Sequence, residues 1–180
     1  TSDRAQVSRK MVLELLATDQ PEREESPDKS SHFWAMADLF AVDATEARFD
    51  ETLKPCADNS SKAMRVNLQS CINCNLCVVA CREVQVNDVI GMAHRGSNSK
   101  VVFDFDDPMG DSTCVTCGEC VQACPTGALM PSTVTSEAGK GDSADFDRKV
   151  DSVCQYCGVG CQLTYHVKDE RIVYVDGRDG

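Results

Sequence analysis

Twelve cysteines in a chain of 180 residues constrain this sequence more than any other feature. Eleven of them fall in three tight groups, in which neighbouring cysteines are separated by two or three residues. A disulfide framework in a secreted domain and metal binding in a reducing compartment are the two explanations for such a count. Cysteines this close together rarely bridge one another, because a disulfide needs particular Cα separations and directions. Residues 1–10 are polar and charged and do not resemble a secretory signal. We therefore expect metal binding and a cytoplasmic location.

The first two cysteine groups are copies of one pattern, C-x2-C-x2-C-x3-C. This spacing is the signature of [4Fe–4S] clusters in two-cluster bacterial ferredoxins, where the last cysteine of each copy ligates the other cluster. Three thiolates two residues apart fit a loop that curls around a cube, and the N–H groups of that loop can bond the sulfurs. The first copy contains Cys71, Cys74, Cys77 and Cys81, and the second contains Cys114, Cys117, Cys120 and Cys124.

The predicted ligation is therefore crossed between the two copies. Cluster 1 is expected on Cys71, Cys74, Cys77 and Cys124, and cluster 2 on Cys81, Cys114, Cys117 and Cys120. Pro125 supports the crossing, because it favours an extended backbone at Cys124 and directs that thiolate outward. Cys81 is followed by Arg82 instead, so we expect its helix to continue through residues 82–85. Zinc fits less well, since its sites usually pair C-x2-C units a dozen or more residues apart.

The third group, Cys154, Cys157 and Cys161, supplies three thiolates, whereas a [4Fe–4S] cluster normally takes four ligands. Three explanations remain open: the fourth ligand lies beyond residue 180, Cys56 supplies it, or the group binds zinc or no metal. Cys56 stands in a polar loop with no neighbouring ligand, so we interpret it as a free thiol. We therefore expect a third [4Fe–4S] cluster whose fourth ligand follows residue 180.

Periodicity and turn residues predict the elements around these groups. Apolar residues favour a helix over 4–17, with Val12, Leu13 and Leu16 on one face that Met11 and Leu15 widen. They favour a second helix over 32–42, whose apolar side consists of Phe33, Trp34, Leu39 and Phe40. Pro-rich and charged residues 19–31 read as an exposed linker. Residues 84–89 are predicted to be helical and 101–105 to form a strand, and 163–167 and 171–175 to form a hairpin. The predicted domains are a helical N-terminal segment and linker (1–60), a two-cluster domain (61–135), a linker (136–150) and an incomplete third unit (151–180).

Charge and hydropathy exclude several functions. The 29 acidic residues outnumber the 18 basic ones, so the chain is a poor candidate for binding nucleic acid. No run of about 18 apolar residues occurs, so we expect no membrane span. His32, His94 and His166 stand without partners at ligand spacing, and we interpret them as structural or exposed residues.

The cysteine blocks and their flanks resemble a known family. Residues 154–165, CQYCGVGCQLTY, look like the start of the catalytic region of molybdopterin-dependent oxidoreductases of the formate dehydrogenase type. Residues 64–68, 81–92, 102–110 and 120–131 are similar to the ferredoxin segment of the alpha subunit of soluble NAD-dependent formate dehydrogenases. That segment is akin to the large iron–sulfur subunit of respiratory complex I. The resemblance implies an α+β fold: a helical N-terminal segment, a two-cluster ferredoxin-like module and the start of a molybdopterin-oxidoreductase [4Fe–4S] domain.

The resemblance also implies a function. Formate would be oxidised at a molybdenum or tungsten bis-pterin centre outside this segment, and its electrons would pass through the three clusters to a partner subunit that carries FMN and NAD. The segment itself would hold the electron relay and no catalytic residue. Relatives with an additional cluster carry its ligands near the position of residues 19–26, which lack cysteine and histidine here. We therefore predict no fourth cluster in the N-terminal third.

Two other functions were weighed against this one. A free-standing ferredoxin-like electron carrier would also need both cysteine copies, but it would not need the third group. A zinc-binding module would use the third group structurally. Visible absorption by cysteine-ligated iron distinguishes the dehydrogenase relay and the free-standing carrier from a zinc protein, which is colourless.

Overall fold

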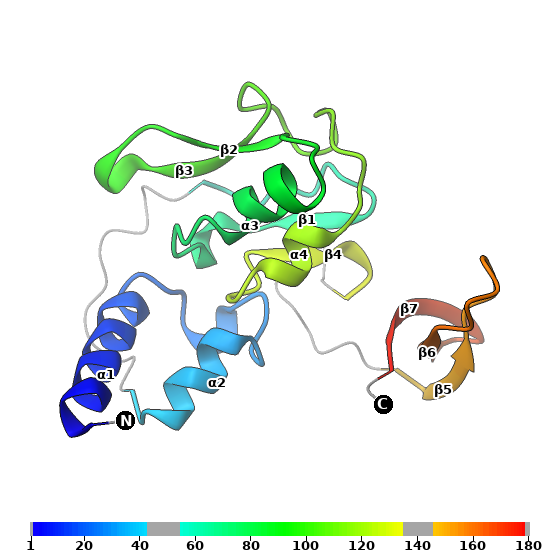
Figure 1. Ribbon diagram of the computed structural model, residues 1–180, viewed down its shortest axis with the longest axis horizontal. Helices are drawn as coiled ribbons and strands as arrows, with labels where there is room; N and C mark the ends of the chain where they lie inside the picture. Colours follow the sequence, from blue (N-terminus) through cyan, green and yellow to red (C-terminus); the bar gives the residue numbers. More distant parts are fainter. Residues whose placement is uncertain (1, 43–54, 135–145, 179–180) are drawn as a thin grey trace.

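The computed structural model describes residues 2–42, 55–134 and 146–178 (Figure 1). Short helices and three small antiparallel sheets make up an α+β fold, as predicted. The helices are α1 (Asp3–Ala17), α2 (His32–Leu39), α3 (Leu76–Val79) and α4 (Glu119–Ala123). The strands are β1 (Met64–Val66), β2 (Ile90–Ala93), β3 (Lys100–Phe103), β4 (Leu129–Pro131), β5 (Arg148–Val153), β6 (Gln162–Lys168) and β7 (Arg171–Gly177).

Strands β1 and β4 enclose the cysteine repeat. They pair antiparallel, with Met64 opposite Pro131 and Val66 opposite Leu129. Because β1 precedes the first copy and β4 follows the second, this pairing brings the two copies together. Helices α3 and α4 pack side by side next to the pair (Figure 1).

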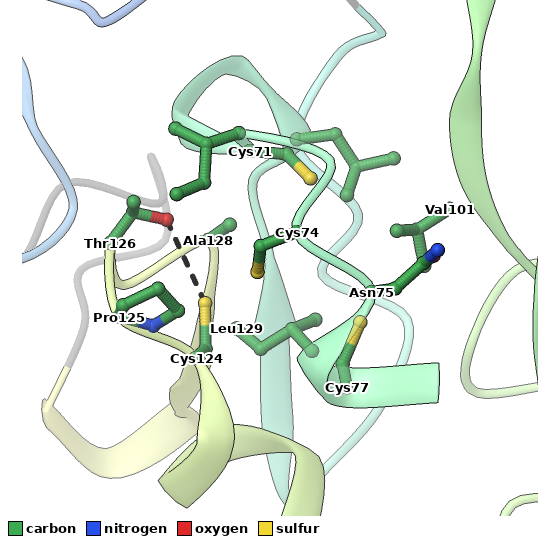
Figure 2. Close-up of a pocket in the computed structure, with 12 residues that line it drawn as sticks. Cys71, Cys74, Asn75, Cys77, Val101, Cys124, Pro125, Thr126, Ala128 and Leu129 are labelled. Atoms are coloured by element: carbon green, nitrogen blue, oxygen red, sulfur yellow. Dashed lines mark hydrogen bonds between the residues drawn. The ribbon is translucent and has the colours of Figure 1, made fainter. Parts of the chain in front are cut away.

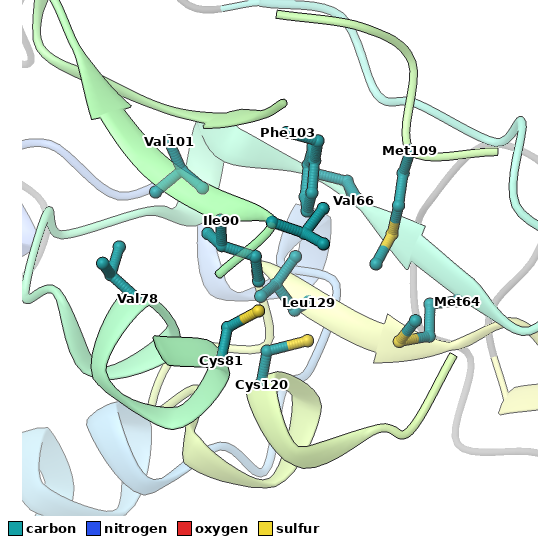
Figure 3. Close-up of a cluster of buried hydrophobic side chains, with 11 residues drawn as sticks. Met64, Val66, Val78, Cys81, Ile90, Val101, Phe103, Met109, Cys120 and Leu129 are labelled. Carbon is teal, nitrogen blue, oxygen red and sulfur yellow. The ribbon is translucent and has the colours of Figure 1, made fainter. Parts of the chain in front are cut away.

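The core of this module lies between the two helices and the strands (Figure 3). Aliphatic side chains from β1 to β4 meet there, together with two cysteines, Cys81 and Cys120, from the ends of the helical segments. Burying a side chain such as Ile90 or Leu129 contributes about 1.5–3 kcal/mol each. Among the described residues, the core has only eleven buried residues, and it directly adjoins the cysteines.

A half-buried carboxylate, Asp58, ties the start of the module to its later loop. The side chain of Asp58 accepts hydrogen bonds from the backbone N–H groups of Met109, at 2.7 Å, and Ser60, at 2.8 Å. Burial alone would raise the pKa of Asp58, but these hydrogen bonds and the charge of Arg65 outweigh it and hold the pKa below its usual value. The backbone of Asp58 also pairs with Val66 of β1.

Helix α3 continues into a π-helical turn, Ala80–Val84, which confirms the predicted extension beyond Cys81. The prediction of a helix over 84–89 is wrong, because the chain turns after Val84. Val86 and Asp88 adopt left-handed backbone conformations, with φ of 55° and 51°. The chain then enters the β2–β3 pair, in which Ile90 lies opposite Phe103. The predicted strand over 101–105 is confirmed, although β3 ends at Phe103.

The N-terminal helices have a separate small core. Helix α1 begins after Ser2, whose hydroxyl accepts a hydrogen bond from the N–H of Ala5. Leu13, Leu16 and Ala17 pack against Phe33 and Trp34 of α2. The wider apolar face predicted for α1 is wrong, because Met11, Val12 and Leu15 are exposed. On the predicted apolar side of α2, Phe33 and Trp34 are buried, whereas Leu39 is exposed and Phe40 is partly buried.

The segment between α1 and α2 is not the exposed linker that its composition indicates. Gln20 and Ser26 are 1% and 0% exposed, and Pro27 is also fully buried. The Ser26 hydroxyl accepts a hydrogen bond from the indole N–H of Trp34 at 3.1 Å. The end of this segment also approaches the second cysteine copy, because Asp28 lies against Gly127, and the N–H of Phe33 in α2 donates to the Pro125 carbonyl at 2.9 Å.

The C-terminal described residues form a three-stranded sheet of order β5-β6-β7. The predicted hairpin is confirmed as β6 and β7, and Asp169 and Glu170 make its turn with φ of 50° and 58°. Two successive positive φ values are typical of a type I′ turn, which suits the twist of paired strands. Strand β5 was not predicted, and it begins at Arg148, inside the predicted linker 136–150.

Candidate metal centres

The loop of the first cysteine copy curls through two left-handed residues. Asn73 and Asn75 have φ of 54° and 64°, a conformation that asparagine tolerates better than most residues. The turn directs the N–H of Asn73 to the sulfur of Cys71 at 3.4 Å. Helix α3 begins immediately afterwards, which places Cys77 in its first turn.

The second copy repeats this geometry. Thr116 and Gly118 have φ of 56° and 81°, and the N–H of Thr116 donates to the sulfur of Cys114 at 3.4 Å. Helix α4 then begins at Glu119, which places Cys120 in its first turn. A left-handed conformation is unusual for β-branched Thr116, so tertiary packing has to maintain it. Both loops therefore present their cysteines in the same way.

The fourth cysteine of the second copy lies at the loop of the first. Cys124 follows the end of α4 with φ −77° and ψ 115°, the extended conformation predicted from Pro125. It lines one pocket together with the three loop cysteines of the first copy (Figure 2). These are Cys71, Cys74 and Cys77. The structure thus brings together the four residues predicted for cluster 1.

The electrostatics of Cys77 reflect this arrangement. Burial, followed by the neighbouring thiols of Cys71, Cys124 and Cys74, raises the pKa of Cys77 to about 12. A thiol with this pKa is protonated at neutral pH. A bound metal ion reverses this preference, because its charge stabilises the thiolates together.

The other predicted set is gathered at the core side of the module. Cys81 and Cys120 are both buried there (Figure 3). Burial raises the pKa of Cys120 to about 12, with further contributions from Cys114, Cys77, Cys117 and Cys81. Three of these neighbours are the predicted partners of Cys120 at cluster 2. The fourth, Cys77, belongs to the cluster 1 set, so the two sets adjoin at the first turns of α3 and α4.

The donor set fits a multi-iron cluster better than a single ion. In the described parts of the chain, no three His, Cys, Asp or Glu side chains converge closely enough to hold one metal ion. Each iron of a [4Fe–4S] cube takes its own cysteine, so the four thiolates surround a larger object. Cys71, Cys74, Cys77 and Cys124 all line one pocket, as such a cluster requires.

The third cysteine group lies in the loop between β5 and β6. The N–H of Cys154 donates to the carbonyl of Cys161 at 2.8 Å and closes the loop. Gly158 and Gly160 allow the tight path with φ of 76° and 77°. Cys157 and Cys161 are exposed, and so is Cys56, which lies two residues before the Asp58 contact with β1.

Thr126 was not singled out from the sequence, whereas His166 fits its interpretation as a structural residue. Thr126 is 2% exposed and lines the cluster 1 pocket, with its hydroxyl 3.7 Å from the sulfur of Cys124. Its position two residues after Cys124 is the only signal that could have indicated this role. His166 is buried, and its Nε2 lies 3.1 Å from a carboxylate oxygen of Asp176. His32 and His94 are exposed, as allowed for by the interpretation above.

Comparison with known families assigns both cysteine regions. Residues 70–128 match the family described as 4Fe-4S dicluster domain, and residues 147–179 match the molybdopterin oxidoreductase Fe4S4 domain. The two cysteine regions are therefore similar to iron–sulfur domains of known families. The predicted resemblance to the iron–sulfur portion of formate dehydrogenases is confirmed by the relatives of the chain.

Those relatives are bacterial. A protein of Staphylococcus haemolyticus, named provisionally as a formate dehydrogenase, is 27% identical over 72% of this chain and 17% of its own length. A protein of Staphylococcus aureus with the same provisional name is 29% identical over 68% of this chain and 16% of its own length. The chain thus spans about one sixth of the curated relatives that it matches.

A solved structure shares the fold. A chain in the crystal structure of an NAD⁺-reducing [NiFe]-hydrogenase in the H2-reduced state superposes with a TM-score of 0.65. The match has 20% sequence identity and covers 78% of this chain and 62% of that chain. Among the helices in the described residues, none is long and apolar enough to cross a membrane.

Proposed function

We propose that the chain is an electron-relay segment of a formate dehydrogenase. The observation that carries this proposal is the pocket formed by Cys71, Cys74 and Cys77 with Cys124 from the opposite copy. A zinc site or a disulfide framework gives no reason for two such crossed quartets. When bound, [4Fe–4S] clusters accept and release single electrons without requiring a substrate site.

The chain's own residues perform three tasks in this proposal. The two crossed quartets hold clusters 1 and 2, and Cys154, Cys157 and Cys161 hold three corners of a third cluster. The N–H groups of Asn73 and Thr116 bond cysteine sulfurs and help to stabilise anionic clusters. Cys77 of one set raises the pKa of Cys120 of the other, so the two sets adjoin, and the proposal requires electron exchange between neighbouring centres.

The finer assignment rests on the relatives and the resemblance. We propose that the remainder of the subunit holds a molybdenum or tungsten bis-pterin centre that oxidises formate or reduces carbon dioxide. The electrons would pass between that centre and a partner subunit with FMN and NAD in the cytoplasm. The matched molybdopterin oxidoreductase domain supports the first part. The NAD⁺-reducing function of the structural neighbour is consistent with the second.

Metal analysis of the chain tests the proposal. The 180-residue protein is produced anaerobically and reconstituted with iron and sulfide, and its iron, sulfide and zinc contents are measured. We expect about eight irons for the two quartets, with broad absorption typical of cysteine-ligated iron. A colourless protein that binds zinc at the quartets would refute the relay. If the native polypeptide is purified and no pterin-containing region accompanies it, the free-standing electron carrier is favoured.

A further inference from the structure

The environments of the two quartets differ, although their loops are alike. Each loop donates one N–H to its first cysteine at the same distance, 3.4 Å, so these bonds do not distinguish the two sites. A side-chain hydroxyl is different: Thr126 lies 3.7 Å from the sulfur of Cys124, in the cluster 1 pocket (Figure 2). Iron-bound thiolate sulfur can only accept, so the Thr126 hydroxyl is the donor in the loaded site.

The repeat has no equivalent hydroxyl at the other site. Thr126 is the second residue after Cys124, and the second residue after Cys81 is Glu83. Glu83 is exposed and brings a negative charge in place of a donor. At the second position after its last cysteine, one copy therefore has a hydroxyl that can bond a cluster 1 sulfur. The other copy has a carboxylate at this position, two residues from a cluster 2 ligand.

The charged residues along the chain also favour an added electron at cluster 1 over cluster 2. The segments that carry the cluster 1 ligands, 66–80 and 120–134, contain no Asp, Glu, Lys or Arg. The segments 81–89 and 111–119, which carry three cluster 2 ligands, contain four carboxylates and one cation, Arg82. Asp104 adds another carboxylate, bonded to the N–H of Thr113 beside Cys114 at 2.6 Å. Asp28 lies beside Gly127 of the second copy, and its carboxylate accepts hydrogen bonds from the N–H and hydroxyl of Ser30.

Exposure adds to this difference. All four cluster 1 cysteines are partly or fully exposed, whereas Cys81 and Cys120 of cluster 2 are buried. Adding an electron makes a cluster more negative. Hydrogen bonds to sulfur and contact with solvent favour that charge, and nearby carboxylates and burial oppose it.

We infer that cluster 1 has the higher reduction potential of the two, and that Thr126 sets part of the difference. This inference rests on the proposed function, since it requires both quartets to hold clusters. One electron shared by the two centres then resides mainly at the site of Cys71, Cys74, Cys77 and Cys124. Each couple takes up one electron, and neither needs a proton.

A redox titration followed by electron paramagnetic resonance tests the inference. The full chain carries Cys157→Ser, so that only the two quartets contribute, and its two midpoint potentials are compared with those of three further variants. Thr126→Val removes the hydroxyl at nearly constant volume. At a fixed potential we expect it to lower the reduced-to-oxidised ratio of the upper couple about tenfold, or 59 mV for one electron.

Two matched variants complete the experiment. Thr126→Ser keeps the hydroxyl and should leave the upper midpoint nearly unchanged, which separates hydrogen bonding from packing. Glu83→Gln removes the exposed charge at the equivalent position and should raise the ratio of the lower couple by about two- to threefold.

The outcomes separate the two proposals. If Thr126→Val moves the lower midpoint, or moves neither while about eight irons remain bound, the inference is wrong and the relay stands. A chain that binds no iron at the quartets would overturn the proposed function and this inference with it.

Discussion

Gly127 is the point where the N-terminal segment meets the second cysteine copy, and replacing it should weaken that contact. Its φ is +74°, and a Cβ atom added there would lie 2.5 Å from Cβ of Asp28 and 3.2 Å from its backbone nitrogen. A left-handed conformation costs an alanine about 1–2 kcal/mol. Overpacking against backbone costs a further 1–3 kcal/mol. We therefore expect Gly127→Ala to lower the free energy of unfolding of the docked N-terminal segment by about 2–5 kcal/mol.

The single tryptophan makes this measurable. Trp34 is buried in α2, one residue from the Phe33 N–H that bonds Pro125, so its fluorescence reports on this contact during urea titration. Gly96→Ala is the matched control. Its φ is +63°, but an added Cβ meets nothing within 4 Å. It should cost only the conformational term of about 1–2 kcal/mol.

A double-mutant cycle isolates the steric term. Asp28→Gly removes the closest atom, so Gly127→Ala should cost less in that background by about 0.5–3 kcal/mol. Equal costs for Gly127→Ala and Gly96→Ala, with no coupling to Asp28, would refute the close approach described here.

Three further predictions concern the metal sites and the module that holds them. Cys124→Ser should lower the iron content by about four atoms while Cys56→Ser leaves it unchanged, and equal losses in both variants would contradict the crossed ligation. Cys77 and Cys120 keep their protons up to a pKa of about 12 without metal, so a chelator should bleach the clusters faster at pH 6 than at pH 8. Bleaching rates that do not depend on pH would count against this. The pKa of Asp58 is lowered in the folded chain, so ionised Asp58 adds to the free energy of unfolding. This stabilisation is complete above the unfolded pKa of about 3.9 and is lost as the pH falls through the folded pKa. Asp58→Asn should cost about 1 kcal/mol near neutral pH and flatten the acid limb of a denaturation series, and an unchanged acid limb would exclude this role.

The cysteine sites were the most predictable part of the chain. The cysteine spacing predicted that Cys124 leaves its own loop for the pocket of the first copy. Pro125 supported this prediction, because it restricts the backbone of the residue before it. The side-chain donor at Thr126 could not be predicted in the same way. It depends on a hydroxyl reaching a sulfur across a turn, and single-sequence patterns carry no information on that distance.

The errors in the fold have a common physical cause. The composition of residues 19–31 is that of a solvated loop, yet Gln20 and Ser26 are buried, and the Ser26 hydroxyl accepts a hydrogen bond from Trp34 of α2. Met11 and Leu15 satisfy helical periodicity, but the described partner α2 covers a narrower face of α1. Strand β5 has no alternating pattern, and its pairing with β6 defines it instead. In each case a partner distant in sequence decided the outcome.

The pairing of β1 with β4 has a consequence for how such a segment can be used in longer chains. Lys62 and Ser132 lie beside each other where the pair begins and ends, and the Ser132 hydroxyl bonds the Lys62 carbonyl at 2.6 Å. Because the two ends of this module are adjacent, sequence added before or after it changes the neighbouring domains and leaves the core of the module intact. Recombination could therefore join the same electron-carrying unit to different catalytic partners at the expense of only two junctions.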